Sequence, residues 1–230
     1  DVYKRQTLSF LIGVSLFLGS ALQQVALLYT DVANAAFFTI FYVPMVPIII
    51  FIFKKDFLHW SVWPSVILCL IGGYLLTNFQ DATVRLGDTL VVLGALFWST
   101  HIIFTGMIVK KYNLPLTIGA IQTLLVALFS FIIGLFSEEF VIDNILNEID
   151  SILYAGILSG GFAFVLQIYA QRNITPAPAA IIFSLEGVFA TIAAWFLLNQ
   201  ILGINNLLGC FFILSGVLLS QLVPLIRKAS

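Results

Sequence analysis

The chain has 230 residues, of which 61% are hydrophobic and 9% are charged, and its formal net charge is −1. A soluble domain carries about 25% charged residues, so this composition, with a mean hydropathy of +1.10, excludes a protein surrounded by water and indicates one embedded in lipid. The near-zero net charge provides no basic surface for nucleic acid. Cys69 and Cys210 lie in separate apolar segments without a CxxC pair, so we predict neither a disulfide nor a metal site.

The first six residues, DVYKRQ, need separate treatment. They resemble the translation of a transposase end sequence used in preparing sequencing libraries, and a native Lys-Arg flank before a membrane helix is the alternative. We interpret residues 1–6 as non-native and exclude them from fold reasoning.

Eight apolar segments follow, each close to the 20 or so residues that a helix needs to cross a bilayer. No connection between them is long enough to form a soluble domain. The longest connection, SEEFVIDNILNEID, has an apolar spacing that predicts a short helix in the interface. The sequence therefore predicts an all-α integral membrane protein with eight transmembrane helices, over residues 8–29, 34–53, 61–78, 87–109, 115–136, 151–171, 178–198 and 204–226.

Lysine and arginine residues gather on one side of the predicted membrane. If the first segment starts in the cytoplasm, the outer connections carry only Arg85. Positive residues mark the cytoplasmic side, so we predict a cytoplasmic C-terminus in a multi-pass protein. The seven residues on the cytoplasmic side are Lys54, Lys55, Lys110, Lys111, Arg172, Arg227 and Lys228.

Two long stretches of the chain share one layout. Residues 15–50 and 159–194 align at an offset of 144 positions. The matches include Gln23 with Gln167 and, further on, Gly72 with Gly216, which apolar composition alone would not align. A fixed internal period indicates a duplicated structural unit. Five segments separate the paired starts, so the two units run in opposite directions, as in many secondary transporters.

The two copies differ in extent. The second unit has five segments over residues 86–226, whereas the first has only three, over residues 7–79. If the repeat is whole, about two helices precede this chain. We therefore expect the parent protein to have ten helices in a 5+5 inverted repeat, of which this chain is the C-terminal part.

Glu186 is the only carboxylate deep inside an apolar run, in the segment AAIIFSLEGVFATIAAW. At 1.5 Å per residue it lies roughly 12 Å into its predicted helix. A carboxylate at such depth is a functional-site hypothesis by default. The structural alternative is a protonated or hydrogen-bonded side chain that ties helices together. The sequence contains no second embedded acid to receive a proton, so coupling to protons or another ion stays open.

Embedded amides and one histidine are the other candidates. Gln23 and Gln167 occupy equivalent positions in the two units, which suits a polar site at their interface; interhelical hydrogen bonding is the alternative. Trp98 and His101 share a helix face and suggest a cavity wall, although a lone histidine is often a packing residue. Gln122 is a weaker candidate on the next segment.

No catalytic motif is present. The sequence lacks a Gly-rich phosphate loop, HExxH, GxSxG and paired aspartates. His101 and Glu186 are the only embedded ionisable side chains, so an intramembrane enzyme would have to be built from these two. We predict that the protein is not an enzyme.

The stretch AFVLQIYAQRNITPAPAAIIFSLEGVFA resembles the penultimate helix pair of the ten-helix, EamA-type permeases of the drug/metabolite transporter superfamily. GDTLVVLGALFWSTHIIF, followed by Gln122, resembles the first two helices of their second unit. Two positions depart from the usual pattern. Glu186 precedes Gly187 where the family usually has proline, and Gln200 replaces a glutamate whose first-unit equivalent is Asp56.

The resemblance implies an integral membrane carrier that moves amino acids, other metabolites or drugs by alternating access and needs no cofactor. We expect it in the bacterial inner membrane, with a small-molecule substrate held between the units. Two other hypotheses remain. A non-transporting scaffold predicts large apolar side chains between the units, and an intramembrane enzyme predicts His101 and Glu186 within hydrogen-bond reach. The expected cavity residues are Gln23, Trp98, His101, Gln122, Gln167 and Glu186.

Overall fold

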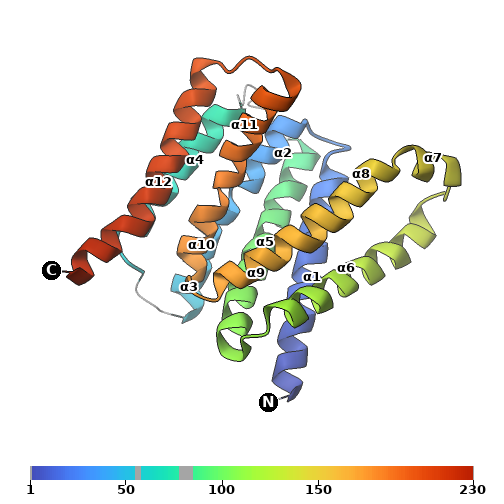
Figure 1. Ribbon diagram of the computed structural model, residues 1–230, viewed down its shortest axis with the longest axis horizontal. Coiled ribbons are helices and arrows are strands. Elements are labelled where there is room, and N and C mark those ends of the chain that lie inside the picture. Colours follow the sequence, from blue (N-terminus) through green and yellow to red (C-terminus); the bar gives the residue numbers. More distant parts are fainter. Residues whose placement is uncertain (1, 55–57, 78–84, 230) are drawn as a thin grey trace.

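The computed structural model describes residues 2–54, 58–77 and 85–229, and every regular element within these ranges is a helix (Figure 1). Lys55, Asp56 and most of the connection after Thr77, on which parts of the predicted topology rest, lie outside the described residues. Seven apolar helical spans in the described chain are long enough to cross a membrane, and Val62–Thr77 forms a shorter apolar helix. The predicted all-α fold with eight apolar segments is confirmed.

The helices follow the chain in two groups. The first unit contains α1 (Val2–Ala26), α2 (Val32–Thr39), α3 (Tyr42–Lys54) and α4 (Val62–Thr77). The second begins with α5 (Leu86–Tyr112) and α6 (Pro115–Ser137), followed by α7 (Ile142–Asn147), which lies in the connection predicted to hold a short helix. The remaining helices are α8 (Ile149–Leu153), the π-helix η1 (Tyr154–Ala163), α9 (Phe164–Gln171), α10 (Pro176–Phe183), α11 (Leu185–Leu198) and α12 (Ile204–Ala229).

Two segments predicted as single helices are each broken in the middle. The predicted segment 34–53 divides into α2 and α3 around Ile40, and the predicted segment 178–198 divides into α10 and α11 at Ser184. These two positions are equivalent at the offset of 144. Pro44 explains the first break, because a proline ring clashes with the carbonyl four residues earlier, here that of Ile40. At the second break the Ser184 hydroxyl donates to the Ile181 carbonyl at 2.6 Å and competes with the helical hydrogen bonds.

The two units meet through α4 and α12, which lie side by side (Figure 1). A Cβ atom on Gly72 would lie 2.7 Å from the Gly209 carbonyl oxygen, and one on Gly216 would lie 2.9 Å from the Ser65 carbonyl oxygen. At the offset of 144, Gly72 corresponds to Gly216 and Ser65 to Gly209, so the two contacts are reciprocal. The two contacts occur in opposite order along α4 and α12, so these helices run antiparallel. Reciprocal contacts of this kind are what a two-fold axis between two copies produces.

The main hydrophobic core lies where the two units meet. It combines residues of α3, α4, α5, α10, α11 and α12, with Tyr42, Cys69, Ala95, Ile181 and Ile213 among its buried members. Helix α1 packs along α5 and α6 on the other side of the bundle (Figure 1). The core thus surrounds both helix breaks and places them near the centre of the bundle.

Candidate functional site

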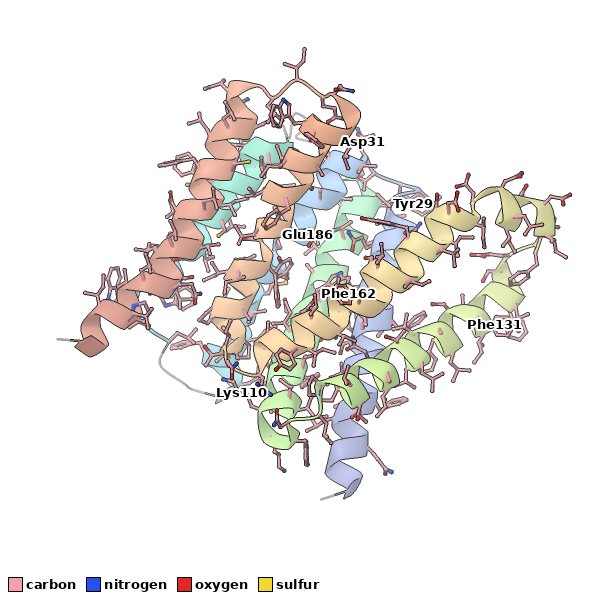
Figure 2. The ribbon with its side chains drawn as sticks, in the orientation of Figure 1. Tyr29, Asp31, Lys110, Phe131, Phe162 and Glu186 are labelled. Carbon is pink, nitrogen blue, oxygen red and sulfur yellow. The ribbon has the colours of Figure 1, made fainter. Side chains whose placement is uncertain are left out.

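Tyr42 and Glu186 stand directly after the two helix breaks. Tyr42 is the first residue of α3 and Glu186 the second residue of α11, and the two are equivalent at the offset of 144. Tyr42 belongs to the main hydrophobic core, against which Leu185, the neighbour of Glu186 in the chain, also packs. Figure 2 shows Glu186 near the middle of the bundle, whereas Phe131 lies on α6 at its edge.

Glu186 and Tyr42 differ in their surroundings. Tyr42 is buried, with 7% of its surface exposed. Glu186 is exposed at the surface of the described chain. Among the described residues, the Glu186 carboxylate has no hydrogen-bond or ion-pair partner.

Neighbouring helices hold the two breaks in position. The Ser184 hydroxyl at the second break lies 3.4 Å from the Cys69 sulfur on α4. At the first break, the Ser99 hydroxyl on α5 donates to the Ala95 carbonyl at 2.7 Å and lies 3.5 Å from the Tyr42 carbonyl oxygen. Tyr42, Ser99 and Ser184 were not predicted from the sequence. The repeat offset, which pairs Tyr42 with Glu186, was the available signal for the tyrosine.

Three of the predicted residues come together on α5 and α6. Trp98 and His101 make a T-shaped contact with 6.1 Å between ring centroids, and Phe164 of α9 stacks on Trp98 at the same separation. The His101 Nε2 atom lies 3.1 Å from Gln122 Oε1. His101 and Gln122 are both fully buried, so they form the inner part of this cluster. The half-buried rings of Trp98 and Phe164 form its outer part.

Several buried polar atoms in this part of the bundle have no hydrogen-bond partner among the described residues. Buried polar groups are normally paired, because leaving one unsatisfied costs about 1–3 kcal/mol. A concentration of such groups at the junction of α5, α6 and α9 indicates a region able to hold water or a polar ligand. The atoms are Trp98 Nε1, His101 Nδ1, Thr105 Oγ1, Gln122 Nε2 and Gln171 Oε1.

The two amides of the repeat stand apart from this cluster. Gln23 on α1 and Gln167 on α9 are both half-buried, and the structure describes no side-chain hydrogen bond for either. The backbone nitrogen of Gln23 approaches Gly94 of α5, with 3.8 Å to the position of a Cβ atom there. Among the described residues, no hydrogen bond or ion pair joins His101 to Glu186.

A polar cluster joins the two units at one end of the bundle. The Thr30 hydroxyl donates to Asp88 Oδ1 at 2.5 Å, and the Arg85 backbone N–H donates to Asp88 Oδ2 at 2.8 Å. The Arg85 guanidinium pairs with Asp31 at 2.6 Å. Asp88 is 1% exposed, whereas Asp31 is exposed. These four residues, which we call the Asp88 cluster, therefore join the connection between α1 and α2 to the start of α5.

Comparison with known proteins places these features in a family. Residues 85–222 match the model of the EamA-like transporter family. An uncharacterized transporter of Archaeoglobus fulgidus is 32% identical over 219 residues, which cover 93% of this chain and 68% of the relative. The uncharacterized transporter YoaV of Bacillus subtilis is 27% identical over 168 residues, covering 70% of this chain and 55% of the relative. The chain thus matches about two thirds of the first relative and about half of the second.

A solved structure has the same fold. It is described only as the crystal structure of a protein, and it superposes on 100% of this chain and 93% of its own with a TM-score of 0.74. The sequence identity is 12%, so this similarity concerns the arrangement of helices alone.

Proposed function

This chain belongs to the EamA-like transporter family, and on that premise we propose that it forms most of a secondary transporter for a small polar or amphipathic metabolite. The substrate sits near the bilayer midplane between the two units. The units rock against each other and open the site to one side of the membrane at a time. The C-terminus lies in the cytoplasm and the membrane is a bacterial inner membrane.

The pair of broken helices is the observation that carries this proposal. Secondary transporters with inverted repeats bind substrates where membrane helices are discontinuous, because the interrupted backbone offers polar groups at that depth. Here both breaks occur at equivalent positions, and Tyr42 and Glu186 stand directly after them. A scaffold protein would have no use for two such breaks, each of which weakens a membrane helix.

The predicted cavity residues divide into two walls in this proposal. Glu186 with Tyr42 forms one wall, and Trp98 with Phe164 forms the other, supported by His101 and Gln122. Gln23 and Gln167 border the site from equivalent helices. The Asp88 cluster closes the outer end, because it links the connection between α1 and α2 to the start of α5.

We also propose that two further helices precede α1 in the complete protein. In an apolar window of 18 residues, the span Gln6–Ala26 has 39% of its residues buried, whereas the window in its repeat equivalent Ile149–Gln171 has none. The first span packs on α5 and α6; the first-unit equivalents of α5 and α6 would cover the second span. Gly156 supports this view, since no atom lies within 4 Å of the position of a Cβ atom there.

Transport by cells that express the complete gene tests the proposal. A panel of radiolabelled metabolites is compared between wild type and Glu186→Gln, with Glu138→Gln, an exposed residue after α6, as the matched control. We expect at least one solute whose uptake or efflux needs the gene, falls with Glu186→Gln and is unchanged with Glu138→Gln. If no solute in the panel responds to expression of the gene, the proposal is wrong.

A further inference from the structure

We propose that a pocket at the end of the bundle marked by Lys110 and Lys111 binds the headgroup of an anionic phospholipid. Figure 2 shows Lys110 at this end and Asp31 at the opposite end. The pocket has a volume of about 360 Å³ and lies between α1 of the first unit and α5 and α6 of the second. None of its lining residues belongs to α2, α3, α10 or α11, so this site is distinct from the one proposed for the substrate, and its ligand is independent of what is transported.

The lining of the pocket combines apolar side chains with a few hydroxyl groups. Ile108 of α5 and Ile118 of α6 contribute apolar surface, and the hydroxyl groups belong to Ser9, Tyr112 and Thr117. The Tyr112 hydroxyl is buried and has no hydrogen-bond partner among the described residues. Buried polar groups are normally paired, so this hydroxyl group is available to a polar ligand in the pocket.

Two positively charged side chains stand beside the pocket. The Lys111 Nζ atom lies 5.0 Å from the centroid of the Tyr112 ring. The Arg172 guanidinium donates to Asn113 Oδ1 at 3.0 Å, and Asn113 connects Tyr112 to Leu114, both of which line the pocket. Each cation is therefore held against the wall of the pocket by a contact with Tyr112 or with its neighbour in the chain.

The sequence around these cations favours an anion. The stretches 89–137 and 151–185, which include both cations, contain no aspartate or glutamate. Helix α6 begins beside the pocket at Pro115, and the described residues provide no side-chain cap for it; the free N–H groups of a helix N-terminus attract negative charge. A phosphate group accepts several charge-assisted hydrogen bonds, so it matches this combination of cations, helix N-terminus and phenol.

The position of the pocket makes a phospholipid the matching source of that phosphate. The pocket lies where one membrane-length span ends at Tyr112 and the next begins at Pro115. On the same helix α6, Leu116 and Leu124 are 72% and 70% exposed, which provides an apolar surface for acyl chains. In the proposed orientation this end faces the cytoplasm, where the leaflet carries anionic lipids and basic pockets between helices bind their headgroups. A lipid bound here contacts both units.

Lipid binding to the complete protein tests the inference. Native mass spectrometry of the protein released from detergent gives a Kd for each bound lipid. The probes are phosphatidylglycerol and phosphatidylcholine with the same acyl chains, of which only phosphatidylglycerol has a net negative charge. We expect one saturable site that binds phosphatidylglycerol about tenfold or more tightly than phosphatidylcholine, a difference of about 1.4 kcal/mol. Equal affinities would overturn the inference, and this comparison requires no variant to fold.

Inorganic phosphate distinguishes a lipid from a soluble anion. At millimolar concentration it should not displace phosphatidylglycerol, because it has no acyl chains to contact the apolar lining. Displacement by phosphate would show that the pocket takes a soluble anion and would overturn the assignment to a lipid. No transported solute is present in either measurement, so neither result bears on the proposed carrier.

Variants then assign the lipid to this pocket. Lys111→Gln and Arg172→Gln should each weaken phosphatidylglycerol binding about fivefold, whereas Lys111→Arg keeps the charge and the affinity. Tyr112→Phe removes only the hydroxyl group and should weaken binding about threefold or more. Lys228→Gln, a matched loss of charge on α12, is the control and should leave binding unchanged. Unchanged affinity in Tyr112→Phe or in the double variant of Lys111 and Arg172, or an equal loss in Lys228→Gln, would place the lipid elsewhere and overturn the inference.

Discussion

The two helix breaks have the same position in the repeat but opposite chemistry. The first is built on Pro44 and followed by buried Tyr42; the second is built on Ser184 and followed by Glu186, which keeps an accessible surface. The backbone interruption is thus common to both units, while the charge belongs to one. The difference teaches that two copies of one unit can keep the same backbone interruption while a single position makes them chemically different; in the proposed carrier, that position makes the site asymmetric.

Moving the carboxylate from one break to the other is expected to have the largest effect. Glu186→Tyr removes the charge, so transport should fall about 10²-fold, equivalent to about 2.7 kcal/mol. Adding Tyr42→Glu to that variant places a carboxylate at the equivalent position and should restore part of the rate. Initial transport rates of the wild type, both single variants and the double variant measure this. A double variant no better than Glu186→Tyr would show that the two breaks do not share one site.

Repairing the first break should stabilise the protein and impair its function. A proline inside a helix costs about 3 kcal/mol, so Pro44→Ala should join α2 and α3 and raise the Tm while transport falls. The matched change at the second break, Ser184→Ala, removes only a competing hydroxyl and should have a smaller effect of the same sign. Thermal melting and transport are measured on the same preparations. If transport survives in a Pro44→Ala protein of higher Tm, the first break is not needed for the site.

The reciprocal contacts between α4 and α12 predict equal effects in the two units. A Cβ atom at Gly72 or Gly216 would come within 3.0 Å of backbone on the facing helix, so Gly72→Ala and Gly216→Ala should each destabilise the protein by about 1–3 kcal/mol. Gly156→Ala is the control, because nothing lies within 4 Å there. Melting in detergent compares the three. A Gly72→Ala protein as stable as Gly156→Ala would contradict the close approach of the two helices.

Two aspartates of the Asp88 cluster should differ in effect because Asp88 is buried and Asp31 is exposed, and the smallest effect of all is expected at Asp31. Asp88→Asn weakens charge-assisted hydrogen bonds in a fully buried position and should destabilise the closed outer end by about 1–3 kcal/mol. Asp31→Asn removes an exposed ion pair, which contributes about 0–1 kcal/mol. A cysteine introduced at this end of the bundle reacts faster with a water-soluble thiol reagent when the end opens, so its labelling rate measures the opening. We expect faster labelling in Asp88→Asn than in Asp31→Asn. The reverse order would show that the hydrogen bonds of Asp88 do not hold this end of the bundle closed.

Much of the fold follows from the sequence, because composition and segment length decide whether a helix can cross a membrane. The eight segments and the offset that pairs Gly72 with Gly216 are visible there. The breaks are not, since the chain is apolar on both sides of Ile40 and of Ser184. Pro44 was the one available signal, and it was read as part of a continuous helix.

The candidate site divides in the same way. Helical spacing puts Trp98 and His101 on one helix face. Glu186 stands out because it is the only carboxylate deep inside an apolar run of the sequence. The partners of Trp98 and His101 come from other helices: Phe164 from α9 and Gln122 from α6. Which helices pack together depends on side-chain fit across the whole bundle, and one sequence contains no direct signal of that. The repeat offset is the exception, because it relates positions that the two-fold axis brings together.

Access to position 186 from water tests the central claim most directly. Glu186→Cys is introduced with Cys69→Ser and Cys210→Ser, the two native cysteines, and treated in membranes with an impermeant thiol reagent applied to either side. Phe131→Cys on α6, where the native side chain is 59% exposed at the edge of the bundle, is the lipid-facing control (Figure 2). A carrier with its site between the two units predicts that position 186 reacts from both sides while position 131 does not. A cysteine at position 186 that is as unreactive as the one at position 131 would contradict the account.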